Sequence, residues 1–265
     1  SPSTAKLYKE NNSSTFFRKK TMSRIQKELK YLVKKWDAEY IYFTSDTFLS
    51  INDDEFEKFV DIYSEFKIPF WLQSRAETIT EHRARKLKES GCHRISIGLE
   101  HGNNEFRKKV LKKKFDNEQM IKASKILADA GIPLTINNMI GFPDETRELI
   151  FDTIELNRKL SYDTTAAFPF APFHGTALQQ LCVERGYITE DFTPGSLNVD
   201  ASLDMPQLSR EEVKGLRRTF ALYAKMPKES WPKIRRAEKF DDEGNRIFAE
   251  LKKDYQEKYF DKNKA

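Results

Sequence analysis

Hydrophobic positions along the chain follow two alternating patterns, and the alternation predicts parallel strands connected by helices. Helical spacing begins near residue 21, where Ile25, Leu29 and Val33 share one face. A second helix is predicted after Asn52, since Asn-Asp-Asp-Glu is typical of a capped helix start. Apolar, β-branched or aromatic runs predict strands at 40–44, 69–73, 93–99, 134–140 and 164–170. Strands that alternate with helices in this way are parallel and have right-handed crossovers.

The two ends of the chain lack this alternation. Residues 1–20 are polar and aperiodic, which predicts an irregular lead-in. Residues 187–208 contain Pro194, Gly195 and Pro206 and predict a connection over the surface. A capping box at Ser209 starts another helix, and the charged tail predicts a peripheral helix with Phe248, Leu251, Tyr255 and Tyr259 near helical spacing. We therefore expect three segments, namely 1–20, 21–186 and 187–265.

Composition narrows the functional class. The chain has 265 residues, of which 38% are hydrophobic and 33% charged, and no apolar run approaches the roughly 20 residues of a bilayer span. With no secretory leader either, we expect a cytoplasmic protein without a membrane partner. The 46 basic and 41 acidic residues are nearly balanced, and the basic clusters at 108–114 and 217–236 are typical of solvated faces, so a nucleic-acid partner is not indicated. Cys92 and Cys182 match no metal-ligand spacing and predict buried thiols.

Candidate chemistry gathers where the predicted strands end. Two strands, at residues 94–100 (RISIGLE) and 135–141 (TINNMIG), each carry a glycine followed by carboxylates. Because parallel strands point their carboxyl ends to one side, Gly98, Glu100 and Gly141 should lie together at a ligand-binding face.

Four motifs in order resemble those of the radical S-adenosylmethionine (radical SAM) enzymes, in particular the branch that often carries a cobalamin-binding domain. They are FTSDTF at 43–48, IGLEHG at 97–102, IGFPDET at 140–146 and PFAPFHGTAL at 169–178. The family patterns they resemble are F-x-D-D-x-F, G-[IL]-E-S-G, I-G-[LF]-P-G-E-T and P-x-P-G-T-x-L. The resemblance implies an α/β fold, a partial (β/α)₆ TIM-like barrel lacking its first strand, with a C-terminal helical extension.

The family's C-x-x-x-C-x-x-C motif, which holds its [4Fe–4S] cluster, is absent from the chain. We expect truncation just after the cysteine loop, and the rival interpretation is natural loss of the cluster. The resemblance implies S-adenosylmethionine as a cofactor, with the cluster in the intact parent only and cobalamin as a candidate cofactor of that parent. We expect no catalytic residue and no metal ligand within this chain.

The resemblance also implies roles for the strand-end residues. Glu100 would accept hydrogen bonds from the ribose hydroxyls or the methionine ammonium, unless it caps a helix. Gly141 would let the backbone approach the adenine, and Gly98 would allow a similarly close approach. Ile140 and Phe142 would flank the adenine, and the alternative for both is ordinary core packing.

Residues from the first two predicted strands complete the expected site. Arg75 would pair with the methionine carboxylate, or else form a surface ion pair with Glu77 or Glu81. Asp46 would accept from the methionine ammonium or serve as a turn residue, and Gln73 lies at the end of the second strand.

Two further residues receive local roles. Asp144 is expected to cap the following helix, although the family prefers glycine there. His101 is expected to be a local hydrogen-bonding group.

The expected function follows from the resemblance. The intact parent would reductively cleave S-adenosylmethionine to a 5′-deoxyadenosyl radical that acts on a small molecule, with cobalamin-dependent methyl transfer as one outcome. The fragment alone, without the cluster loop and a cobalamin domain as partners, would be inactive. One alternative is a non-catalytic barrel that binds a nucleotide-like ligand or a partner protein. Another is an RNA-modifying enzyme of the methylthiotransferase kind.

Overall fold

The computed structural model describes residues 19–45, 47–196 and 200–260, which divide into two compact units. The first unit contains residues 19–41 and 51–69, with helices α2 (Met22–Trp36) and α3 (Asp53–Ser64). The Asn52 side chain caps α3 and forms the predicted capping box with Glu55.

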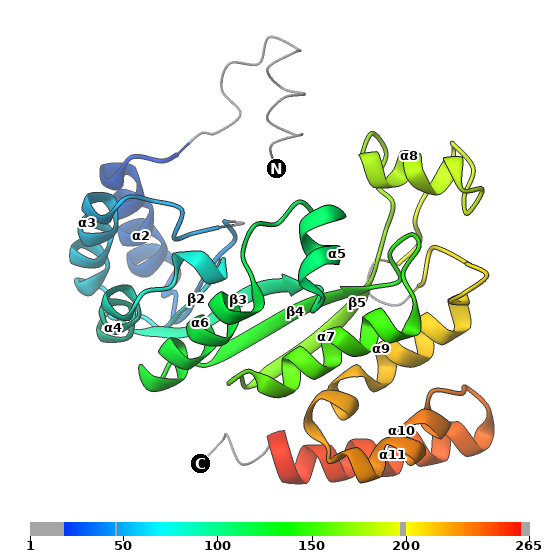
Figure 1. Cartoon of the computed structure of the whole chain (residues 1–265). Coiled ribbons are helices and arrows are strands. Elements are labelled where there is room, and N and C mark those ends of the chain that lie inside the picture. The colour runs from blue at the N-terminus through cyan, green and yellow to red at the C-terminus, as the bar shows by residue number, and fades with distance from the viewer. Residues whose placement is uncertain (1–18, 46, 197–199, 261–265) are drawn as a thin grey trace. The chain divides into compact units, whose positions relative to one another are not determined.

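The second unit is built on the sheet. Its strands run in the order β1-β2-β3-β4-β5, with parallel pairing from β2 to β5. The strands are β1 (Ile41–Phe43, at the boundary between the units), β2 (Phe70–Ser74), β3 (Cys92–Glu100), β4 (Leu134–Ile140) and β5 (Thr164–Pro169). The helices are η1 (Ala76–Thr78), α4 (Glu81–Glu89), α5 (Asn104–Lys109), α6 (Asn117–Asp129), α7 (Arg147–Lys159) and α8 (Ala177–Glu184). This five-stranded α/β sheet, shown in Figure 1, is consistent with a partial barrel.

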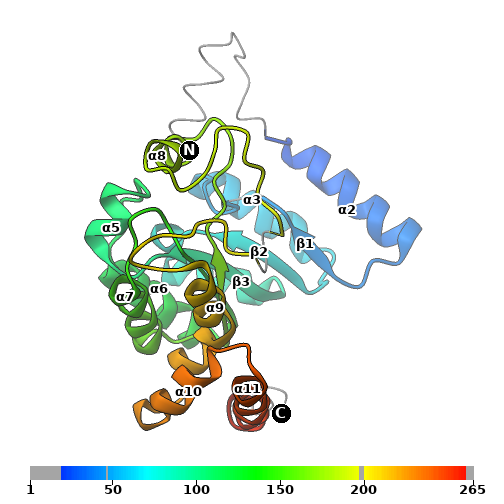
Figure 2. The ribbon, with the colours of Figure 1, turned by 90° about the vertical axis from the view of Figure 1, so that its right-hand side faces the viewer.

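The C-terminal part of this unit is helical. It contains α9 (Arg210–Lys225), η2 (Lys228–Ser230), α10 (Trp231–Ala237), α11 (Asp242–Tyr255) and a π-helical turn η3 (Gln256–Phe260). Helices α10 and α11 lie side by side in both views (Figures 1 and 2). Leu251 is buried in the core and Phe248, Tyr255 and Tyr259 pack against it, as the tail pattern predicts. No helix in the described part of the chain is long and apolar enough to cross a bilayer.

The two faces of the sheet differ in burial. On β4, Leu134, Ile136 and Ile140 are buried, whereas the alternate residues are half-buried. Buried Asn138 lies on the helix-covered face, where Asn157 of α7 donates to its Oδ1 at 2.9 Å. The opposite set, here called the open face, consists of Trp71, Gln73, Arg94, Ser96, Gly98, Thr135, Asn137, Met139, Thr164, Ala166 and Phe168.

One connection contains more than one helix, and one expectation about connections is wrong. The crossover between β3 and β4 contains two helices, α5 and α6, because residues 110–116 form a loop between them. The segment 187–208 does not simply run over the surface, since Leu203, Met205 and Leu208 are buried in the main core. Ala201, Leu203 and Met205 alternate with polar residues at strand spacing over only five positions, and this short run was missed.

A buried ion pair joins the C-terminal helices to α7. Arg147 Nη1 donates to Glu238 Oε2 at 2.9 Å, and Arg147 Nη2 donates to Oε1. Tyr223 of α9 donates to the same Oε1 at 2.6 Å. The Arg147 and Glu238 side chains are only 13% and 7% exposed. Removing one partner from such a pair leaves a buried charge without compensation.

We therefore expect Glu238→Ala to lower the free energy of unfolding by about 3–5 kcal/mol, measured by urea denaturation. The matched control is Glu211→Ala, because Glu211 pairs with Lys214 on the surface and its side chain is 69% exposed. That control should change stability by less than about 1 kcal/mol. Equal effects of the two substitutions would contradict the assignment.

Candidate functional site

Glu100 ends β3 in an unusual backbone conformation. Its φ is 64°, and the β3–β4 register shifts between Gly98 and Glu100. The side chain folds back along the strand, since a Cβ added to Gly98 would lie 2.3 Å from Glu100 Oε1. Gly98 therefore leaves room for the chain's own carboxylate, and its expected role beside the cofactor stays a prediction.

Lys113 holds this carboxylate. Its Nζ lies 2.7 Å from Glu100 Oε1, and both side chains are partly shielded, at 28% and 21% exposed. The sequence assigned Lys113 to a solvated cluster at helical spacing, which is wrong because α5 ends at Lys109 and Lys113 lies in the following loop. Within the described residues, Glu100 Oε2 accepts no hydrogen bond, so one carboxylate oxygen remains available to a ligand.

The turn after β4 closes around the carboxylate of Glu145. Glu145 Oε2 accepts from the backbone N–H of Gly141 and, at 3.0 Å, from that of Phe142. Gly141 has φ 80°, and a Cβ there would lie 3.0 Å from Val213 of α9, so glycine suits both the backbone and the space. Asp144 also has positive φ, 62°, a conformation that aspartate tolerates better than most residues.

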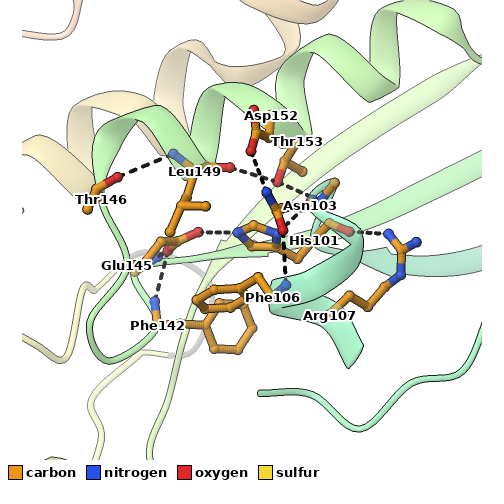
Figure 3. Close-up of polar contacts among 12 residues, drawn as sticks. His101, Asn103, Phe106, Arg107, Phe142, Glu145, Thr146, Leu149, Asp152 and Thr153 are labelled. Carbon is orange, nitrogen blue, oxygen red and sulfur yellow. Dashed lines mark hydrogen bonds and ion pairs between the residues drawn. The ribbon is translucent and has the colours of Figure 1, made fainter. Parts of the chain in front are cut away.

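His101 links this turn to the loop after β3 (Figure 3). Its Nε2 lies 2.9 Å from Glu145 Oε1, and both side chains are fully buried. The Asn103 N–H donates to His101 Nδ1 at 3.0 Å, so the neutral ring carries its proton on Nε2 and donates to Glu145. Burial raises the pKa of Glu145, whereas the donors from His101, Phe142 and Gly141 oppose that shift. The predicted local role of His101 agrees with these contacts.

Arg107 extends the network on the other side of His101. It donates to the His101 carbonyl, to the Phe115 carbonyl at 3.2 Å and to Asn117 Oδ1 at 2.8 Å. Burial of this guanidinium lowers its pKa, and the groups that accept its hydrogen bonds are neutral carbonyl and amide oxygens. The His101 ring stacks on Phe106 with centroids 4.2 Å apart. The loop after β3, the start of α6 and the turn after β4 therefore form one buried assembly.

Ile140 and Phe142 belong to the core. Both side chains are buried, and the Phe142 ring lies 5.1 Å from that of Phe170 and 5.7 Å from that of Phe106. The core-packing alternative therefore describes their side chains.

The candidate residues at the end of β2, Gln73 and Arg75, form hydrogen bonds and ion pairs with other residues than those of this assembly. Gln73 donates to the Tyr42 hydroxyl, and its carbonyl accepts from Phe48 N–H at 2.8 Å. Arg75 forms the alternative ion pair with Glu77. Asp46 lies outside the described residues, so its expected role stays a prediction.

Asp144 does not cap α7, contrary to the expectation. Thr146 is the N-cap, and its hydroxyl accepts from Leu149 N–H. The left-handed turn places Asp144 before the helix, where it contacts Arg185 at 3.1 Å and Tyr187 at 2.9 Å.

The residues present do not fit an iron–sulfur cluster. A cluster of this family needs three thiolates, and the chain has two cysteines, both buried. Cys92 begins β3 and Cys182 lies on α8, and burial raises their pKa values to about 12 and about 11. The described residues also contain no group of three or more His, Cys, Asp or Glu that would hold a metal ion.

Comparison with known proteins identifies the family. Residues 8–156, just over half of the chain, match the Radical SAM superfamily. The chain is similar to a protein of Pyrococcus horikoshii described as an uncharacterized methyltransferase, at 27% identity over 78% of this chain and 46% of that protein. It is also similar to tRNA-2-methylthio-N(6)-dimethylallyladenosine synthase of Halalkalibacterium halodurans, at 29% identity over 39% of this chain and 20% of that protein. The chain thus spans less than half the length of these relatives.

Solved structures show the same fold at low identity. Coproporphyrinogen III oxidase of Escherichia coli matches with a TM-score of 0.53 and 17% identity, covering 77% of this chain and 46% of that one. Methylornithine synthase matches with a TM-score of 0.52 and 16% identity, covering 78% and 54%. At these identities the likeness concerns the fold.

We expect Glu145→Gln to destabilise the chain by about 2 kcal/mol, because a carboxamide cannot accept in both directions. If its oxygen faces Gly141 and Phe142, its NH₂ faces the Nε2–H of His101; the flipped amide places NH₂ against the backbone donors. Urea denaturation measures the loss, and Glu148→Gln on exposed α7 surface is the control. Equal stability of Glu145→Gln and the parent chain would show that Glu145 is not an obligate acceptor.

Proposed function

The chain belongs to the Radical SAM superfamily, and we propose that it forms the adenosyl-binding part of an enzyme that cleaves S-adenosylmethionine reductively. The observation that carries the proposal is that Glu100 ends β3 and the Gly141 turn follows the neighbouring strand β4. Both lie within the region that matches the family. The buried hydrogen bonds of Glu145 with His101 and Phe142 hold the loop after β3 and the turn after β4 in a fixed relative position.

Residues of this chain would bind and orient the cofactor. Glu100 Oε2 would accept from ribose hydroxyls, with Lys113 holding the other oxygen. The backbone of the turn around Gly141 would lie against the adenine, on the side away from Val213. The cofactor itself, when bound beside a reduced cluster, supplies the 5′-deoxyadenosyl radical. We assign the cluster ligands of that enzyme to residues other than these 265, since two buried thiols do not provide them.

Methyl transfer is the reaction we favour for the whole protein. The support is the similarity to the P. horikoshii protein described as a methyltransferase, which extends over most of this chain. Cobalamin belongs to this proposal as a candidate cofactor of the whole protein.

An RNA-modifying methylthiotransferase is the second candidate, favoured by the similarity to tRNA-modifying synthases. That similarity covers a smaller share of the chain, and the segment after the sheet is helical in α9, α10 and α11 rather than the β-domain that group usually carries. A non-catalytic barrel that binds a nucleotide-like ligand or a partner protein is the remaining alternative. Finding the cysteine triplet in the whole protein would exclude it.

We expect the chain to bind S-adenosylhomocysteine saturably in isothermal titration calorimetry. Glu100→Gln should weaken binding about tenfold, because losing one charge-assisted hydrogen bond costs about 1.5 kcal/mol. Glu105→Gln is the matched control, since Glu105 pairs with Lys109 on the exposed side of α5. Equal affinity of the Glu100→Gln variant and the parent chain would contradict the role of Glu100.

We also expect the chain alone to be inactive. After incubation with iron, sulfide and dithionite, it should release no 5′-deoxyadenosine from S-adenosylmethionine, because its two thiols are buried and cannot form a three-cysteine site. Liquid chromatography of the reaction products provides the measurement. Turnover by the isolated chain would overturn this part of the proposal.

A further inference from the structure

We propose that the open face of the sheet contains a carboxylate-binding site centred on Arg94, which anchors an elongated carboxylic acid substrate. The inference rests on the proposed function in one respect, namely that the substrate lies on this face of the barrel. The Arg94 site lies toward the opposite end of the strands from Glu100 and the Gly141 turn.

Arg94 is held by hydroxyl groups from the next two strands of the sheet, β4 and β5. Its Nη1 lies 3.0 Å from Thr135 Oγ1 on β4 and 3.4 Å from Thr164 Oγ1 on β5. The two hydroxyl oxygens lie 2.8 Å apart. The Arg94 guanidinium carbon also lies 5.8 Å from the centre of the Trp71 ring on β2. Four strands thus contribute to one cluster, and the guanidinium is fixed on both sides.

The cluster has more hydrogen-bond donors than acceptors. Both threonine oxygens accept from Arg94, and one of the two hydroxyls donates to the other. One hydroxyl hydrogen is therefore left over, in addition to the unused N–H groups of Arg94. Ser96 adds to this excess, because its oxygen already accepts from Trp71 Nε1 at 2.8 Å. A donor-rich site of this kind suits an anion.

The positive charge lacks a counter-charge within the described part of the chain. No carboxylate there forms an ion pair with Arg94, although the side chain is half-buried. Because Nη1 is occupied by the threonines, Nε and Nη2 remain as the free edge of the guanidinium. These two parallel donors match the two oxygens of a carboxylate. A phosphate would also be attracted, but the planar fork favours the carboxylate.

The position of Arg94 sets the shape of the ligand. At about 3.3 Å per residue, Arg94 lies roughly 13 Å before Gly98 and roughly 20 Å before Glu100 along β3. Between these levels the open face presents Ser96 and, level with Gly98, Asn137, and the apolar register partners Met139 and Phe168 lie just past the level of Glu100. A substrate anchored at Arg94 needs an extended, partly apolar body to reach the adenosyl group.

The test is a titration of the ¹⁵N-labelled chain with 4-phenylbutyrate, observed at the Nε–Hε signal of Arg94 and the indole signal of Trp71. We expect a saturable shift of both signals, and no shift with the neutral amide 4-phenylbutyramide. Inorganic phosphate at equal concentration should give a weaker effect. Absence of a shift with 4-phenylbutyrate, or an equal shift with the amide, would overturn the proposal.

Variants separate the site from general charge effects. Arg94→Gln should weaken 4-phenylbutyrate binding at least tenfold, and Arg94→Lys should restore it only in part, because lysine lacks the fork. Arg246→Gln, at an exposed ion pair with Glu250, should leave binding unchanged. Unchanged binding in Arg94→Gln would contradict the assignment.

A final titration, with S-adenosylhomocysteine, distinguishes a substrate carboxylate from that of the cofactor. S-adenosylhomocysteine carries its own carboxylate, and we expect it to leave the Arg94 signal in place. A shift of Arg94 equal to that caused by 4-phenylbutyrate would assign the site to the cofactor and overturn the substrate proposal. Since 4-phenylbutyrate binding requires no cofactor, failure of the Glu100 site and failure of the Arg94 site are separate results.

Discussion

The site depends on one physical constraint, the burial of the Glu145 carboxylate. A carboxylate removed from water must be supplied with donors, and here the donors come from two different strand-end segments. His101 contributes one of them from beyond β3, and the backbone of the turn after β4 contributes the others. Satisfying a single buried group therefore fixes the relative position of the two segments that we propose bind the adenosyl group.

Much of the fold could be predicted from the sequence because its signals are local. The five strands are found at the predicted runs, and the capping boxes at Asn52 and Ser209 are present. The burial of residues 201–208 could not be predicted, since it depends on which surface the segment meets. The cap of α7 was misassigned to Asp144 because Asp and Thr are both good caps, and only the left-handed turn decides between them.

The cofactor contacts of Glu100 and Gly141 stay predictions, and the residues that hold them in place were missed. Glu100 and Gly141 were singled out because they follow strands, whereas Glu145, Lys113 and Arg107 act through loop contacts that no strand or helix pattern reveals, the contact of Glu145 with His101 spanning 44 positions of the sequence. Glu145 lies within the IGFPDET motif at 140–146, and a carboxylate in the turn that directly follows a strand is a signal that could have been used. Arg94, Thr135 and Thr164 lie on three different strands and are brought together by the strand register. That register is not known until β3, β4 and β5 are aligned in the structure.

Backbone amide hydrogen exchange tests the central claim most directly. If the Glu145 carboxylate locks the turn, the amides of Gly141 and Phe142 are protected in the ligand-free chain about as strongly as the core amides of β4, although they lie in a loop. The account predicts this protection, and it predicts its loss in Glu145→Gln while the β4 core amides stay protected. Rapid exchange of Gly141 and Phe142 in the unmodified chain would contradict the account, because the two strand ends would then not be held together by the buried carboxylate.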